Sequence, residues 1–178
     1  MRDGESSKRV VYVFDTSVFL ALHRHNTQVI ELPKEIWDLL DQMMRDGEII
    51  SHGFVYGEIV NEKTEKPDMI TRWLIPKKAY FQNESEDQAS LVSVIIKDYQ
   101  KLIDPAREKE QADPWVVALA MLLNKQTSFL EDAEYVVVTQ ENPNSPIKIP
   151  AACRKYGVGC ISLKEFFEKN RIKIAIAK

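Results

Sequence analysis

The sequence has few cysteines, no long apolar run and no excess of positive charge. Cysteine occurs only at Cys153 and Cys160, without a C-x-x-C spacing, which favours reduced intracellular thiols over a structural disulfide. No stretch is long and apolar enough for a transmembrane helix, and the polar start over residues 1–5 (MRDGE) is unlike a secretory signal. We therefore expect a cytoplasmic protein with no attachment to a membrane.

The formal net charge is -3, so the composition does not indicate a strongly basic nucleic-acid binder. A local basic rim matters more than the net charge, however, and nucleic acid stays open as a ligand. Apolar residues make up 44% and charged residues 29% of the chain, an ordinary globular composition. The 178 residues predict a single domain, preceded by a loose polar lead-in over residues 1–8.

The most informative stretch is Val10–Phe14, a run of five apolar residues that ends at Asp15 and two hydroxyl residues. Such a run predicts a short strand buried on both faces, as in a parallel sheet covered by helices. Tyr135–Thr139 has the same character and leads to Glu141. Because open α/β sheets bind ligands at the carboxyl ends of their strands, we expect Asp15 and Glu141 at one functional edge.

The rest of the chain alternates helical and strand patterns, which predicts a three-layer α/β/α domain around a mainly parallel sheet of four or five strands. The pairing of Asp113 with Pro114 predicts a helix start with Asp113 as its N-cap. Predicted helices cover residues 18–23, 33–46, 54–61, 68–74, 86–103, 113–123, 150–156 and 162–170; predicted strands cover 48–51 and 159–161, with an edge strand at 172–176.

Two further carboxylates, Glu58 and Asp113, stand at predicted helices near this edge and complete a quartet with Asp15 and Glu141. Hard oxygen donors of this kind suit Mg²⁺ or Mn²⁺; Zn²⁺ is disfavoured because no His or Cys pair has ligand spacing. A divalent ion keeps such a cluster ionised against its own repulsion. It can also activate a water and hold a phosphate oxygen, as phosphodiester hydrolysis requires.

Neighbouring polar residues have expected roles around the quartet. Ser17 and Thr139 are candidates for positioning the water or an outer-shell ligand. Lys148 and Arg154 belong to the segment after Glu141 and are the best candidates for phosphate contacts around the acids.

Three of the acids also have simpler readings. Asp113 can be only an N-cap, Glu58 can face solvent, and Glu141 can be an ordinary loop acid. Asp15 is harder to dismiss, because an acid directly after a buried strand is costly unless it is paired or ligated. The three histidines, His23, His25 and His52, are irregularly spaced and are expected on the surface or in loops.

Four segments, in order, resemble the motifs of PIN domains: FDTSVF at 14–19, YGEI at 56–59, ADPWVVALA at 112–120 and VTQE at 138–141. More narrowly, the chain resembles the DUF4411 branch of that superfamily, including IKIPAACR at 147–154 and ISLKEF at 161–166. The resemblance spans residues 10–174, nearly the whole chain.

The resemblance implies a Mg²⁺- or Mn²⁺-dependent ribonuclease. Such enzymes are often the toxin of a bacterial or archaeal toxin–antitoxin pair. Asp15, Glu58 and Asp113 would be the principal catalytic and metal-binding acids. Glu141 would take the fourth place, where many PIN domains have Asp or Asn, so its contact with the metal is direct or through water. The implied partners are an RNA substrate, an antitoxin protein and a second copy of the chain.

Two other interpretations fit parts of the sequence. A PIN-like protein- or RNA-binding module with little or no catalysis fits the net acidity and the longer acid at Glu141. A phosphatase of the haloacid dehalogenase type also has an acid after its first strand. That family expects a second Asp two residues later, where this chain has Ser17, and we reject it for this reason.

Overall fold

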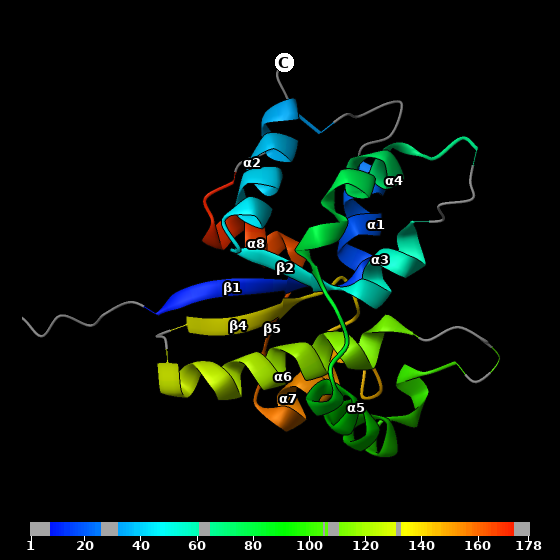
Figure 1. Ribbon diagram of the computed structural model, residues 1–178, viewed down its shortest axis with the longest axis vertical. Coiled ribbons are helices and arrows are strands. Elements are labelled where there is room, and N and C mark those ends of the chain that lie inside the picture. The colour runs from blue at the N-terminus through cyan, green and yellow to red at the C-terminus, as the bar shows by residue number, and fades with distance from the viewer. Residues whose placement is uncertain are drawn as a thin grey trace, which may run out of the picture.

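The computed structural model describes residues 8–25, 32–60, 65–104, 106, 111–130 and 133–172. Within them, five parallel strands form one sheet in the order β3-β2-β1-β4-β5. Helices cover both faces of this sheet (Figure 1), so the expected three-layer α/β/α architecture is confirmed. The strands are β1 (Arg9–Phe14), β2 (Ile49–His52), β3 (Phe81–Gln82), β4 (Ala133–Val138) and β5 (Gly159–Ile161).

The helices divide between the two faces of the sheet. Figure 1 shows α1, α2, α4 and α8 on one side and α5, α6 and α7 on the other, while α3 follows β2. The helices are α1 (Thr16–His25), α2 (Lys34–Arg45), α3 (Gly53–Ile59), α4 (Met69–Leu74), α5 (Glu86–Asp98), α6 (Ala112–Leu130), α7 (Ile149–Tyr156) and α8 (Leu163–Lys169), with 3-10 turns η1 (Ile75–Tyr80) and η2 (Gln100–Leu102). No helix of the described part of the chain is long and apolar enough to cross a bilayer.

The two central strands, β1 and β4, are buried on both faces, as their apolar runs predict. Val13, Phe14, Val137 and Val138 are fully or almost fully buried. β1 pairs with β4 over its whole length, and the register places Phe14 opposite Val138. The first residues beyond both strands are therefore neighbours at the carboxyl edge of the sheet.

The strand order makes β1 and β4 the point where the chain reverses direction across the sheet. From β1 the chain builds outward through β2 to β3, and it then returns through α5 and α6 to β4 on the other side of β1. The helices that follow β1 and β4, α1 and α7, lie on opposite faces (Figure 1). Open α/β sheets bind their ligands in the crevice that this arrangement leaves.

Two local predictions need correction, and a third is not tested. The helix predicted over residues 86–103 ends at Asp98, because Tyr99 leaves helical geometry (φ -129°, ψ 64°) and donates its hydroxyl to the Ala151 carbonyl at 3.1 Å. α6 begins at Ala112, one residue before the predicted start, so Asp113 lies in the first turn and is not the N-cap. The predicted edge strand at 172–176 lies outside the described residues beyond Ile172.

Candidate active site

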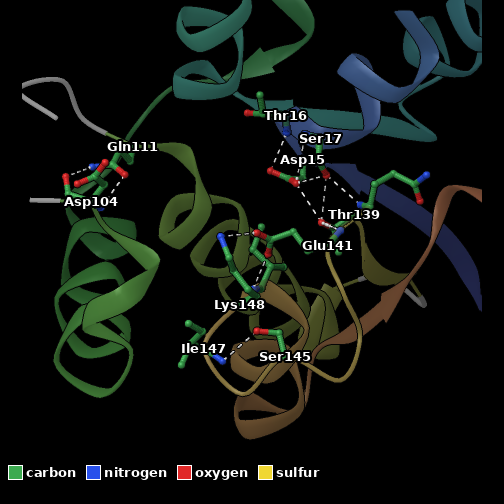
Figure 2. A network of polar contacts seen from close by, with 12 residues as sticks. Asp15, Thr16, Ser17, Asp104, Gln111, Thr139, Glu141, Ser145, Ile147 and Lys148 are labelled. Atoms are coloured by element: carbon green, nitrogen blue, oxygen red, sulfur yellow. Dashed lines mark hydrogen bonds and ion pairs between the residues drawn. The ribbon is translucent and has the colours of Figure 1, made fainter. Parts of the chain in front are cut away.

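Asp15 lies at the end of β1 and is only 2% exposed. Its Oδ1 accepts a hydrogen bond from the Thr16 backbone N–H (2.7 Å), and its Oδ2 accepts from the hydroxyls of Ser17 (2.6 Å) and Thr139 (3.0 Å). Figure 2 shows these three groups surrounding the carboxylate. Burial, followed by the charge of Glu141, raises the pKa of Asp15, while the hydroxyl hydrogen bonds oppose that rise.

The hydroxyls of Ser17 and Thr139 also fasten the chain that follows β4. Ser17 Oγ accepts from the Gln140 N–H (2.9 Å), and Thr139 Oγ1 accepts from the Glu141 N–H (3.2 Å). Each hydroxyl thus holds the Asp15 carboxylate on one side and a backbone amide on the other. Both residues therefore position the strand ends; their predicted role toward a water stays a prediction.

Glu58 reaches the same edge from α3. Its Oε2 accepts the Thr16 hydroxyl, and its Oε1 accepts the Ala112 N–H at 3.0 Å, at the first residue of α6. The carboxylate consequently joins the start of α1 to the start of α6, and it does not simply project into solvent. Its bond to a helix-start N–H uses one of the backbone donors that a helix leaves unpaired at its first turn.

Glu141 lies in the loop after β4 and is held from two directions. Its Oε2 accepts the Ile149 N–H (2.8 Å) at the start of α7, and its Oε1 forms an ion pair with Lys148 Nζ (3.0 Å). The ion pair is visible in Figure 2. The hydrogen bond to Glu141 raises the pKa of Lys148, so this lysine carries its charge inside the site.

The environment of Asp113 strongly disfavours its charged form. Burial raises its pKa to about 8, with further contributions from the charges of Asp15, Glu141 and Glu58. A carboxyl group that faces three others in a partly buried place holds its proton near neutral pH unless a cation compensates the charge. This is the electrostatic signature of a site that favours bound positive charge.

The four acids line one open pocket of about 380 Å³ at the carboxyl edge of β1 and β4. Ser17 and Lys148 also line this pocket, which we call the acid pocket. Arg154 does not: it lines a neighbouring pocket that shares Glu141 with the first. The structure therefore brings together every acid of the predicted quartet and separates the two predicted RNA-contacting cations.

The donor set fits a hard divalent cation in its chemistry, since carboxylates and hydroxyls of this kind are what Mg²⁺ and Mn²⁺ bind in proteins. In the described residues, however, no three His, Cys, Asp or Glu side chains are already grouped as metal ligands. Glu58 and Glu141 are instead turned toward Thr16 and Lys148. A bound ion would have to draw these side chains away from their present hydrogen bonds.

Several residues of the acid pocket escaped the sequence reasoning. Thr16, the partner of Glu58, was marked only by its place after Asp15. Lys101 lines the pocket from η2 and had no signal, because the helix was predicted to run through it. Gln111 exchanges two hydrogen bonds with the Asp104 backbone, at 2.9 and 2.8 Å, and so closes the loop beside the pocket (Figure 2).

The prediction for His52 was wrong. This residue ends β2, is 0% exposed, and stacks on Trp115 with ring centroids 5.2 Å apart. Its Nδ1 accepts the Phe54 N–H at 3.2 Å and thereby caps α3, the helix that carries Glu58. A histidine at the end of a buried strand can be an uncharged helix cap, a role that irregular spacing does not reveal.

Comparisons with known proteins bear on the family and the fold. Among solved structures, VapBC2 from Rickettsia felis, bound to a DNA fragment from the promoter, is similar with 10% identity and a TM-score of 0.49, over 85% of this chain and 98% of that one. PAE2754 from Pyrobaculum aerophilum is similar with 13% identity and a TM-score of 0.45, over 96% and 95% of the two chains. No curated protein matches the chain.

The family is shown by its sequence profile. The profile described as "Domain of unknown function (DUF4411)" matches residues 12–174, which include all four acids of the acid pocket. This match confirms the narrower of the two resemblances seen in the sequence. The chain belongs to the DUF4411 family.

Proposed function

We propose that this protein is a Mg²⁺- or Mn²⁺-dependent endoribonuclease that hydrolyses phosphodiester bonds in single-stranded RNA and leaves a 5′-phosphate and a 3′-hydroxyl. The observation that carries the proposal is the convergence of Asp15, Glu58, Asp113 and Glu141 on one pocket at the carboxyl edge of the two central strands. These acids come from four different elements of the fold, spread over residues 15–141.

In this proposal Asp15, Glu58 and Asp113 hold the ion, and Glu141 assists directly or through water. The chemistry that the ion supplies is polarisation of a water molecule and of a phosphate oxygen. The chain's own residues prepare that chemistry. Ser17 and Thr139 hold the Asp15 carboxylate in one orientation at the wall of the pocket.

Two other residues of the acid pocket, Lys148 and Thr16, have proposed roles beside the acids. Lys148 lies beside the acids at 3.0 Å from Glu141 and is placed to meet a phosphate of the RNA strand as the strand enters. Thr16 keeps Glu58 at the mouth of α6, close to Asp113. Together these contacts keep Glu58 and Glu141 beside the pocket, and ion binding would turn both carboxylates from Thr16 and Lys148 toward the ion.

The biological setting follows from the PIN resemblance of the sequence. We propose that the protein works in the cytoplasm as the toxin of a toxin–antitoxin pair, with an antitoxin protein and a second copy of this chain as its protein partners. The gene beside it should then encode a small protein that binds this one and suppresses the RNA cleavage.

The test is RNA cleavage by the wild type, Asp15→Asn and Asp38→Asn in buffers with Mn²⁺ or EDTA. Asp38 is an exposed acid of α2 that pairs with Lys34 and has no contact with the acid pocket, so Asp38→Asn is a matched control. We expect cleavage by the wild type and Asp38→Asn in Mn²⁺ only, and none by Asp15→Asn. Equal cleavage by wild type and Asp15→Asn would disprove the nuclease proposal.

A second candidate function is a PIN-like binding module with little or no catalysis. The observation that favours it is the present pairing of Glu141 with Lys148 and of Glu58 with Thr16, which occupies two of the four acids. Calorimetry with Mn²⁺ separates the two functions. A nuclease binds the ion and loses that binding in Asp113→Asn, whereas a module without a metal site gives the same trace for both proteins.

A further inference from the structure

A second pocket of about 310 Å³ lies next to the acid pocket, between the loop after β4, α7 and the start of α8. Glu141 lines both pockets, and Thr139, which lines the second pocket, donates its hydroxyl to Asp15 of the acid pocket at 3.0 Å, so the two pockets adjoin. The remaining walls are largely apolar and are formed by Pro143, Pro150, Val158 and Ile161. Cys160 and three polar or charged side chains, Arg154, Ser162 and Glu165, complete the lining.

We propose that this second pocket, here called the base pocket, receives a nucleobase of the RNA strand beside the phosphate that enters the acid pocket. The inference rests on the proposed function and adds a substrate contact to it. Sequence-tolerant and sequence-specific RNA-binding proteins alike splay single-stranded bases away from the backbone and pack them on apolar or planar surfaces. A pocket that borders the acid pocket at Glu141 lies within reach of a base that adjoins the bound phosphate.

The charges of the base pocket favour a base over a second phosphate. Two carboxylates, Glu141 and Glu165, line it against the single guanidinium of Arg154. A phosphate would meet net negative charge there, whereas a base is neutral and gains from the apolar walls. Chemistry therefore assigns the phosphate to the neighbourhood of Lys148 and the heterocycle to the base pocket.

Arg154 is held in a geometry that suits a flat ligand. Its Nη1 donates to the Pro143 carbonyl at 2.7 Å, which ties the end of α7 to the loop after β4. One edge of the guanidinium is thus used to fix the side chain, and its plane remains a surface on which a base can stack. The sequence predicted a phosphate contact for Arg154, which stays untested; the present proposal gives this residue the stacking role instead.

The rim of the base pocket offers fixed hydrogen-bonding groups. Glu165 Oε2 accepts from both the N–H and the hydroxyl of Ser162, each at 2.8 Å, in the capping box that starts α8. These contacts immobilise the carboxylate, and its remaining lone pairs can accept from the N–H groups of a base edge.

Cys160 provides a direct probe, because it lines the base pocket and is partly exposed, whereas Cys153 is fully buried. Trypsin cleaves after Arg154 and Lys155, so the two cysteines fall in different peptides and mass spectrometry reports each of them separately. The protein is labelled with iodoacetamide in Ca²⁺ buffer, alone, with a single-stranded RNA, or with an abasic strand of the same length.

We expect the RNA, at about ten times its Kd, to slow labelling of Cys160 about tenfold, because only the free protein reacts. The abasic strand, which keeps the phosphates, should protect Cys160 far less at equal occupancy. Equal protection by both strands would show that backbone occupies the pocket, and it would overturn the assignment to a base.

Variants supply the second readout. Arg154→Ala should weaken RNA binding about tenfold, the typical loss of one stacking contact, and should leave binding of the abasic strand unchanged. Lys155→Ala is the matched control, because Lys155 is the next residue of α7 and pairs with Asp98 at 2.6 Å, outside the pocket. A loss of both ligands in Arg154→Ala would indicate a structural or phosphate-binding role and would contradict the proposal.

The two proposals fail in different ways. If RNA is cleaved in a manner that depends on Asp15, yet no RNA protects Cys160, the nuclease proposal stands and the base pocket is wrong. If RNA protects Cys160 and the abasic strand does not, yet no cleavage is seen, the base pocket stands as part of a binding module and the nuclease proposal is wrong.

Discussion

Protonation of His52 is expected to destabilise the fold at the helix that carries Glu58. The ring is 0% exposed, and its Nδ1 accepts the Phe54 N–H that starts α3. Burial lowers the pKa of His52 to about 4, and the effects of Glu84 and Gln88 in the opposite direction are smaller. A ring protonated at Nδ1 could not accept the Phe54 N–H, so the cap of α3 would be lost. Its positive charge would also lie in a buried place, away from water.

The sign and size of the effect follow from the two pKa values. An unfolded chain has a histidine pKa of about 6.5, so below that pH the unfolded state takes up a proton that the folded state refuses. The titration of His52 does not change the free energy of unfolding above pH 6.5. Between pH 6.5 and 4 it lowers that free energy as the pH falls. Each pH unit in this window is worth about 1.4 kcal/mol, so the full displacement corresponds to about 3 kcal/mol.

The assay is urea unfolding of the wild type and His52→Gln at pH 7 and pH 4.5, followed by tryptophan fluorescence, since Trp115 stacks on the ring. Carboxylates titrate in both proteins, and the difference between the two isolates His52. The wild type should lose about 2–3 kcal/mol more than the variant over this interval. Equal losses in the two proteins would show that His52 does not resist protonation, and the reasoning from burial would be wrong.

Three further predictions concern the acid pocket. Ser17→Ala removes the hydroxyl between Asp15 and the Gln140 N–H and should lower the free energy of unfolding by about 1–3 kcal/mol. A loss below about 0.5 kcal/mol in urea unfolding would contradict this. Asp113→Asn should stabilise the protein in EDTA at pH 7 by up to about 4 kcal/mol, because the Asp113 pKa of about 8 obliges the folded state to bind a proton. The gain in stability should grow as the pH rises from about 4 to 8, and saturating Mn²⁺ should reduce or reverse it. A gain that does not depend on pH would show that the raised pKa of Asp113 is not its cause. Lys148→Ala should weaken RNA binding and lower the slope of log K against log salt by about 1, measured by titration at several salt concentrations.

Local sequence patterns were sufficient for the layers of this fold and for part of the site. The apolar runs that end at Asp15 and Thr139 predicted buried parallel strands, and burial on both faces follows from their composition. The capping box at Ser162 and Glu165 likewise predicted the last helix. The expectation that Asp15 needs partners came from the cost of burying a carboxylate, which depends on no neighbour's identity.

Which segments meet was decided only in three dimensions. β4 pairs with β1 across more than a hundred residues of chain, and this pairing brings Thr139 to the Asp15 carboxylate. The bond between Thr16 and Glu58, the turn of η2 that carries Lys101 into the acid pocket, and the burial of His52 have the same origin. The spacing of apolar residues predicts which face of a helix or strand is buried. It does not predict which other element covers that face, because the hydrophobic effect is non-directional. Hydrogen bonds between distant side chains form only after packing has chosen the strand order, and for that reason the acid pocket needed the tertiary structure.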